Sequence, residues 1–113
     1  MASPKVLPEV RIILERLQPG ERAIELDPPD NIGHRTKLGG EPDFIQPGQK
    51  PMCRQCRQTM TFIAQIDSID GLDEYTPAGI VHPEENYMFG DAGMIYVYLC
   101  FECLEAVSEV QCY

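Results

Sequence analysis

Four of the five cysteines form two pairs with the spacing of metal-binding turns. Two residues separate Cys53 from Cys56, and two separate Cys100 from Cys103. That spacing lets both sulfurs of a pair point from one tight turn toward a common centre, and two such turns supply four thiolates for tetrahedral zinc at about 2.3 Å per sulfur. The cysteines therefore predict one structural Zn²⁺ per chain, with no coordination position left for water or substrate.

The rival chemistries for these cysteines are redox exchange and disulfide bonding. A redox dithiol usually begins a helix in a βαβ unit, where the helix dipole lowers the thiol pKa, and neither pair has that context. The N-terminus lacks the apolar stretch of a secretory signal, and no apolar run approaches the ~18 residues needed to cross a bilayer. We therefore expect a cytoplasmic protein with reduced thiols. The fifth cysteine, Cys112, is expected to be a buried thiol near the chain end.

Two predicted strands place the cysteine pairs. From Thr59 to Ile66 the side chains alternate between two faces, one of which carries Met60, Phe62, Ala64 and Ile66. Residues 93–100 are apolar or aromatic on both faces, as in a central strand. One cysteine pair precedes the first strand and the other follows the second, so antiparallel pairing brings both pairs to the same end. This is a zinc-ribbon arrangement, although the 43 residues between the pairs exceed the commoner spacing.

Outside this core the sequence predicts little regular structure. Apolar residues at helical spacing, with Pro8 suited to a first turn, predict an amphipathic helix over 8–18. Residues 22–26 alternate as a short strand, 27–52 form an irregular proline- and glycine-rich loop, and 104–113 are either a strand or a helical turn. We expect an α+β, mostly β fold: one zinc-binding domain over 1–113 with a small antiparallel sheet, a zinc-ribbon core at 53–103 and a short N-terminal helix.

The charge of the chain is unevenly distributed. All nine Lys and Arg lie in residues 1–57, beside eight acids, whereas residues 58–113 carry ten acids and no Lys or Arg. Such a field repels phosphate backbones and attracts basic protein surfaces, chiefly through the association rate. An acidic surface that only aids solubility is the plain alternative. We expect a protein partner with a basic surface, and neither nucleic acid nor membrane.

The sequence offers no convincing active site. His34 and His82 lie in no recognised metal or triad motif, and the acids around Gly71 do not have the spacing of a calcium loop. The two glycine-rich segments, 38–40 and 90–93, match no phosphate-binding fingerprint and are expected to be tight turns. We therefore assign no catalytic residue.

Three segments taken in order resemble a known family. They are Lys37-Leu38-Gly39-Gly40-Glu41-Pro42-Asp43, then the first cysteine pair with Met60-Thr61-Phe62-Ile63-Ala64-Gln65-Ile66-Asp67, and finally Phe89-Gly90-Asp91-Ala92-Gly93-Met94-Ile95-Tyr96-Val97. This order resembles the YwqG-like family of bacterial proteins, and is also similar to the C-terminal domain of the programmed cell death 2 protein. The chain departs from the family in its short length and in Arg57, where zinc turns often place glycine.

The resemblance implies a protein-binding role. Members of the bacterial family look like components of toxin–immunity loci, and the eukaryotic relatives look like protein-binding chaperones. We therefore predict an immunity protein that blocks a cognate toxin, whose loops over 27–52 and 67–89 cover the toxin's cleft. The predicted contact residues are acidic or aromatic, since tyrosine is enriched at binding hot spots: Asp70, Asp73, Glu74, Tyr75, Glu84, Glu85 and Tyr87.

Two other functions stay open at this point. A chaperone or assembly factor for a basic client would share the charge pattern, and gene neighbourhood separates it from an immunity protein. A hydrolase that reverses a toxin's modification would have to lose turnover on mutation of His34, Asp91 or another acid. The sequence favours binding over catalysis because no nucleophile and base stand together.

Overall fold

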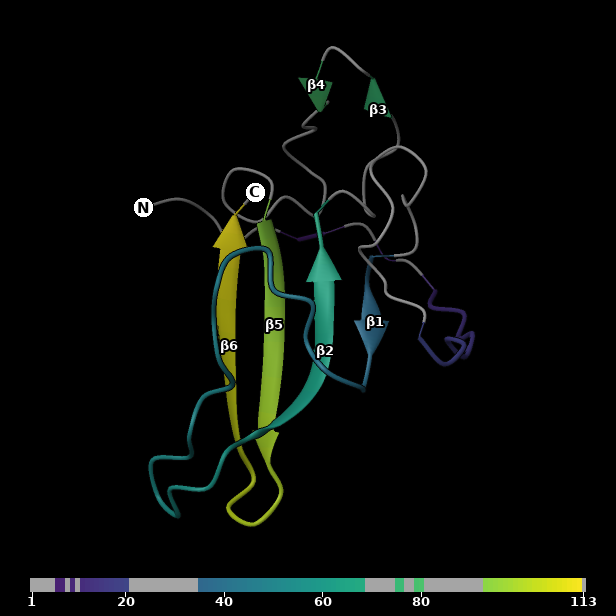
Figure 1. The fold of residues 1–113 in the computed structure, drawn as a ribbon. Helices are drawn as coiled ribbons and strands as arrows, with labels where there is room; N and C mark the ends of the chain where they lie inside the picture. Colours follow the sequence, from purple (N-terminus) through teal and green to yellow (C-terminus); the bar gives the residue numbers. More distant parts are fainter. Residues whose placement is uncertain are drawn as a thin grey trace.

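The computed structural model describes residues 6–7, 9, 11–20, 35–68, 75–76, 79–80 and 93–112. Its regular structure is entirely β, with no helix in these residues. The strands are β1 (Lys37–Leu38), β2 (Thr61–Asp67), β3 (Tyr75–Thr76), β4 (Gly79–Ile80), β5 (Gly93–Cys100) and β6 (Glu105–Cys112). Four of them form an antiparallel sheet in the order β1-β2-β5-β6, and β3 pairs with β4 in a separate hairpin (Figure 1).

The two long strands predicted from the sequence form the centre of the sheet. β2 and β5 run antiparallel, with Thr61 opposite Leu99 and Asp67 opposite Met94. β5 is flanked on its other side by β6 in an unbroken register from Gly93↔Cys112 to Cys100↔Glu105. The apolar character of both faces of β5 is thus explained by its central position, and the C-terminal tail is a strand.

A β-bulge changes the alternation of β2. The register shifts between Phe62, which pairs with Tyr98, and Ala64, which pairs with Val97. Because directly opposed residues share a face, the extra residue moves Gln65, opposite Tyr96, onto the same face as Phe62. The predicted face of Met60, Phe62, Ala64 and Ile66 is therefore wrong beyond Phe62: Ile66 is 36% exposed and Gln65 is fully buried.

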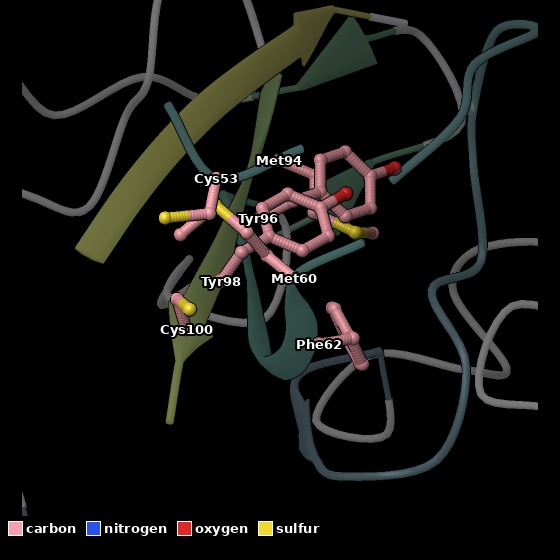
Figure 2. Close-up of a cluster of buried hydrophobic side chains, with 7 residues drawn as sticks. All are labelled: Cys53, Met60, Phe62, Met94, Tyr96, Tyr98 and Cys100. Carbon is pink, nitrogen blue, oxygen red and sulfur yellow. The ribbon is translucent and has the colours of Figure 1, made fainter. Parts of the chain in front are cut away.

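One face of the sheet carries the core. Its buried side chains are Cys53, Met60, Phe62, Met94, Tyr96, Tyr98 and Cys100 (Figure 2). The chain between β1 and β2 crosses in front of β2, β5 and β6 and covers this face (Figure 1). Phe44 and Ile45 of that segment pack against the core, and Phe44 lies 5.4 Å from the Tyr96 ring, centroid to centroid. The segment 27–52 was predicted to be an irregular loop. Its described part, from residue 35 onward, instead contains strand β1 and a stretch that packs against the core.

The expected N-terminal helix is absent from its described part. Residues 11–18 have no regular structure, and Ile13 and Leu14 are 89% and 73% exposed. A helix of this length gains most of its stability from packing its apolar stripe, and in the described residues nothing covers that stripe. The predicted strand at 22–26 lies outside the described residues. No helix in the described ranges has the length and apolar character needed to span a membrane.

Candidate metal centre

The two cysteine pairs lie in turns of the same construction. In the first turn the Arg57 amide donates to the Cys53 carbonyl at 2.9 Å, and in the second the Leu104 amide donates to the Cys100 carbonyl at 2.7 Å. The residue after each pair has a positive φ, 61° for Arg57 and 58° for Leu104. Each turn therefore coils back on its first cysteine, so both sulfurs of a pair face the same side.

The first turn is also closed by a short backbone ladder. The Cys53 amide donates to the Gln58 carbonyl at 2.9 Å, and Met52 forms a β-bridge with Thr59. The second turn instead links two long strands directly, since β5 ends at Cys100 and β6 begins at Glu105. The antiparallel pairing of β2 with β5 brings both turns to one end of the sheet, as predicted.

The four predicted ligands converge. The sulfurs of Cys53, Cys56, Cys100 and Cys103 all lie within 4.8 Å of one another. Cys56 Sγ is 3.6 Å from Cys100 Sγ, much longer than a disulfide bond of about 2.05 Å and close to the ~3.8 Å edge of a tetrahedron with zinc–sulfur bonds of 2.3 Å. Cys53 and Cys100 are buried and the other two are half-buried. The cluster has the size and donor set of a metal site.

The protonation of the thiols is uneven. Backbone amides of Cys56 and Gln55 lower the pKa of Cys53 to about 7, because hydrogen bonds favour the thiolate. Burial raises the pKa of Cys103 to about 12. Because metal binding requires thiolates, a metal that enters the cluster would release a proton from Cys103.

Cys112 does not belong to the metal cluster. It ends β6 and pairs with Gly93, whereas the four converging cysteines lie at the other end of that strand. It is half-buried, and its backbone carbonyl accepts a hydrogen bond from Gln46 Nε2 at 2.8 Å.

The predicted partner-binding side chains are not placed by the structure. Tyr75 begins β3, where its backbone pairs with Ile80. The other six predicted contact residues, and His34, His82 and Asp91, lie outside the described residues.

Sequence reasoning missed a buried polar cluster that joins the 35–46 segment to the sheet. Arg35 Nε donates to Asp67 Oδ2 at 2.9 Å, and both side chains are almost fully buried. Gln65 accepts a hydrogen bond from the Asp43 amide and donates to the Arg35 carbonyl. Lys37 Nζ lies 2.9 Å from Asp43 Oδ2. Each charge in the cluster is therefore paired, as burial requires.

Comparison with known proteins gives one informative match. The chain is 30% identical over 104 residues to the uncharacterized protein YpfL of Salmonella typhimurium, a match that covers 90% of this chain and 21% of that protein. The chain thus spans about a fifth of the length of this relative. No protein-family model and no solved structure matches the chain.

Proposed function

We propose that the chain is a zinc-stabilised module that binds another protein. The observation that carries the proposal is the convergence of four thiols within 4.8 Å. Four sulfur ligands select zinc or iron over magnesium and calcium, and a tetrahedral ion held by four protein ligands has no position for substrate. The metal would hold the turns at 53–56 and 100–103 together and would leave recognition to the surface around them.

The charge distribution supports a basic partner. Residues 58–113 hold ten acids and no Lys or Arg, and a zinc ion with four thiolates would add a formal charge of about −2. Of these acids Glu102 and Glu109 are exposed in the structure, whereas Asp67 is buried against Arg35. Exposed acids speed the encounter with a positively charged surface.

The specific form of the proposal is an immunity protein that occludes a toxin. It is supported by the order of the three segments that resemble the YwqG-like family. In the described residues all three segments are in contact, since the Asp43 amide of the first donates to Gln65 of the second, and Asp67 of the second pairs with Met94 of the third. In this role five acids, with Tyr75 and Tyr87 as anchors, would replace contacts that the toxin makes to an anionic substrate: Asp70, Asp73, Glu74, Glu84 and Glu85. The match to a fifth of a longer protein is compatible with a module that is also joined to other sequence.

The decisive experiment is co-purification from the native host with identification of the bound protein by mass spectrometry. A stoichiometric toxin whose gene is adjacent supports the immunity role, whereas a housekeeping client supports a chaperone. Charge reversal at Asp73 and Glu74 should then slow association with that protein and weaken its salt dependence. The matched control is Glu9→Lys with Glu15→Lys, which changes the net charge equally at two exposed residues. Association rates that respond equally to both double variants, or to neither, contradict the acidic-loop mechanism.

A further inference from the structure

Strand β6 is an outer strand of the sheet and contains no proline, lysine or bulge. It spans eight residues, keeps an unbroken register with β5, and has no other strand beside it among the described residues. Natural outer strands are commonly protected by proline, by a bulge or by charged side chains, and the only such feature in the sequence of β6 is its two acids, Glu105 and Glu109. At its C-terminal end, the backbone carbonyl of Cys112 already accepts a hydrogen bond from Gln46 Nε2. The side of residues 105–110 that faces away from β5, called the free edge below, pairs with no strand among the described residues; Figure 1 shows the chain between β1 and β2 passing beside the upper part of β6.

A pocket opens beside this free edge. Its apolar lining includes Met52, Met60 and Val107, and its volume is about 400 Å³. Val107 lies on the core face of β6, opposite Tyr98. A strand added to β6 would place on that face the side chain opposite Val107, next to the pocket. Backbone pairing with an adjacent pocket for alternate side chains is the arrangement by which strand addition gains both affinity and specificity.

The charges along the edge select the chemistry of the added strand. Two residues from Val107 on the same face stand Glu105 and Glu109. Glu105 already accepts a hydrogen bond from Gln55 at 3.0 Å, and Arg54 lines the pocket near it. Glu109 is exposed and has no basic residue opposite it in β5, where its partner is Tyr96. A basic side chain opposite Glu109 is thus favoured, whereas a second copy of this chain, with net charge −9, would be repelled.

We propose that the free edge of β6 is a docking site for an extended basic segment of a partner protein. The added strand carries an apolar side chain that enters the pocket at Met52 and Met60. Two residues along the same strand it carries an Arg or Lys that pairs with Glu109. This inference rests on the proposed protein-binding function and names the surface and the kind of segment that would be bound.

The test is titration of the metal-loaded protein with the peptide Thr-Arg-Thr-Leu-Thr-Arg-Thr, blocked at both ends. The peptide is palindromic, so it presents leucine opposite Val107 and arginine opposite Glu109 in either strand direction. We expect amide resonances of residues 105–110 to shift in proton–nitrogen NMR spectra and their hydrogen exchange to slow, because added backbone hydrogen bonds protect them. The same peptide with glutamate for arginine should bind at least about fivefold more weakly, the ratio set by roughly 1 kcal/mol per cross-strand charge pair.

A charge exchange separates strand addition from general attraction. Glu109→Lys should weaken binding of the arginine peptide and strengthen binding of the glutamate peptide. Glu15→Lys makes the same change of charge at an exposed position outside the sheet, and it should change the affinity for both peptides equally and only slightly. Shifts confined to other segments, equal effects of the two variants, or protection of β6 by self-association without peptide would overturn the proposal. If a native partner is captured but the peptide does not bind to β6, the proposal of strand addition is wrong and the proposed protein-binding function is retained.

Discussion

Arg57 and Leu104 occupy the same backbone position in the two cysteine turns. Each follows the second cysteine of its pair, each has a positive φ, and each donates its amide to the carbonyl of the first cysteine. Neither is glycine, and a left-handed backbone costs an ordinary residue about 1–2 kcal/mol. The fold therefore carries strain at two matched positions, one beside each half of the candidate metal site.

Glycine should relieve that strain. We expect Arg57→Gly and Leu104→Gly each to raise the free energy of unfolding by about 0.5–1 kcal/mol, the backbone gain less the greater freedom that glycine gives the unfolded chain. Chemical denaturation of the metal-loaded protein measures the change. Arg57→Ala and Leu104→Ala are the matched controls, since they remove the side chains and keep the strain. Equal stabilisation by alanine would contradict the backbone explanation.

The two core tyrosines should respond oppositely to loss of their hydroxyls. Tyr96 Oη donates to the Asp43 carbonyl at 2.9 Å and accepts from the Ile45 amide at 3.1 Å. Tyr98 Oη is buried and has no partner in the described part of the chain. We expect Tyr96→Phe to destabilise the fold by about 1–3 kcal/mol, and Tyr98→Phe to leave stability unchanged or raise it by about 1 kcal/mol. Urea unfolding at neutral pH measures both, and similar losses would contradict this reading.

Tyr98 should also make the stability of the fold decrease at alkaline pH. Burial raises its pKa from 10.0 to about 12, so the unfolded chain loses this proton at lower pH than the native protein. Stability should be unaffected by Tyr98 below pH 10 and should fall as the pH rises from 10 to 12. Tyr98→Phe should make that decline shallower, though not flat, because burial also raises the pKa of Tyr96. Unfolding curves at several alkaline pH values test the slope, and identical slopes would exclude this role.

The strands were predictable because their signals are local. Alternating side chains predict a strand at 59–66, and apolar character on both faces predicts one at 93–100. One cysteine pair precedes the first strand and the other follows the second, so antiparallel pairing of the strands brings both turns to one end of the sheet. The bulge after Phe62 was not predictable, because it depends on pairing with β5. The helix over 8–18 was predicted from its periodicity, but periodicity does not supply the surface that an apolar stripe must cover.

The buried polar cluster could not be predicted for a related reason. Arg35 and Asp67 are 32 residues apart, and each looks like an ordinary surface residue in the sequence. Only the bulge turns Asp67 and Gln65 inward, where the 35–43 segment meets them. The burial of the Gln65 side chain is thus a direct consequence of the bulge in β2, which the sequence does not reveal.

Gln65 should be intolerant of a charge. Its side-chain oxygen accepts from the Asp43 amide at 2.9 Å, and its Nε2 donates to the Arg35 carbonyl at 2.8 Å. Gln65→Glu replaces the donor with an oxygen that faces this carbonyl and the Asp43 carboxylate, so we expect a loss of roughly 3 kcal/mol or more at neutral pH. The loss should shrink at acidic pH, where protonation restores a donor. Thermal melting against pH, with Gln65→Met as an uncharged control, checks it, and a loss independent of pH would contradict the electrostatic cause.

Replacing single cysteines should distinguish the four candidate metal ligands from Cys112. We expect the wild-type protein to bind about one zinc ion per chain. Cys53→Ser and Cys100→Ser each remove one of four converging sulfurs, so their bound zinc should fall well below that value. Because the free energy of binding a structural metal is also folding free energy, both variants should melt at lower temperature, and chelation should lower the wild-type melting temperature in the same way. Cys112→Ser, at the opposite end of β6, should keep both the metal and the melting temperature. Elemental analysis and calorimetry measure the two quantities. Zinc retained by the Cys53 and Cys100 variants, or wild-type melting unaffected by chelation, would show that the cysteine cluster does not hold a structural metal.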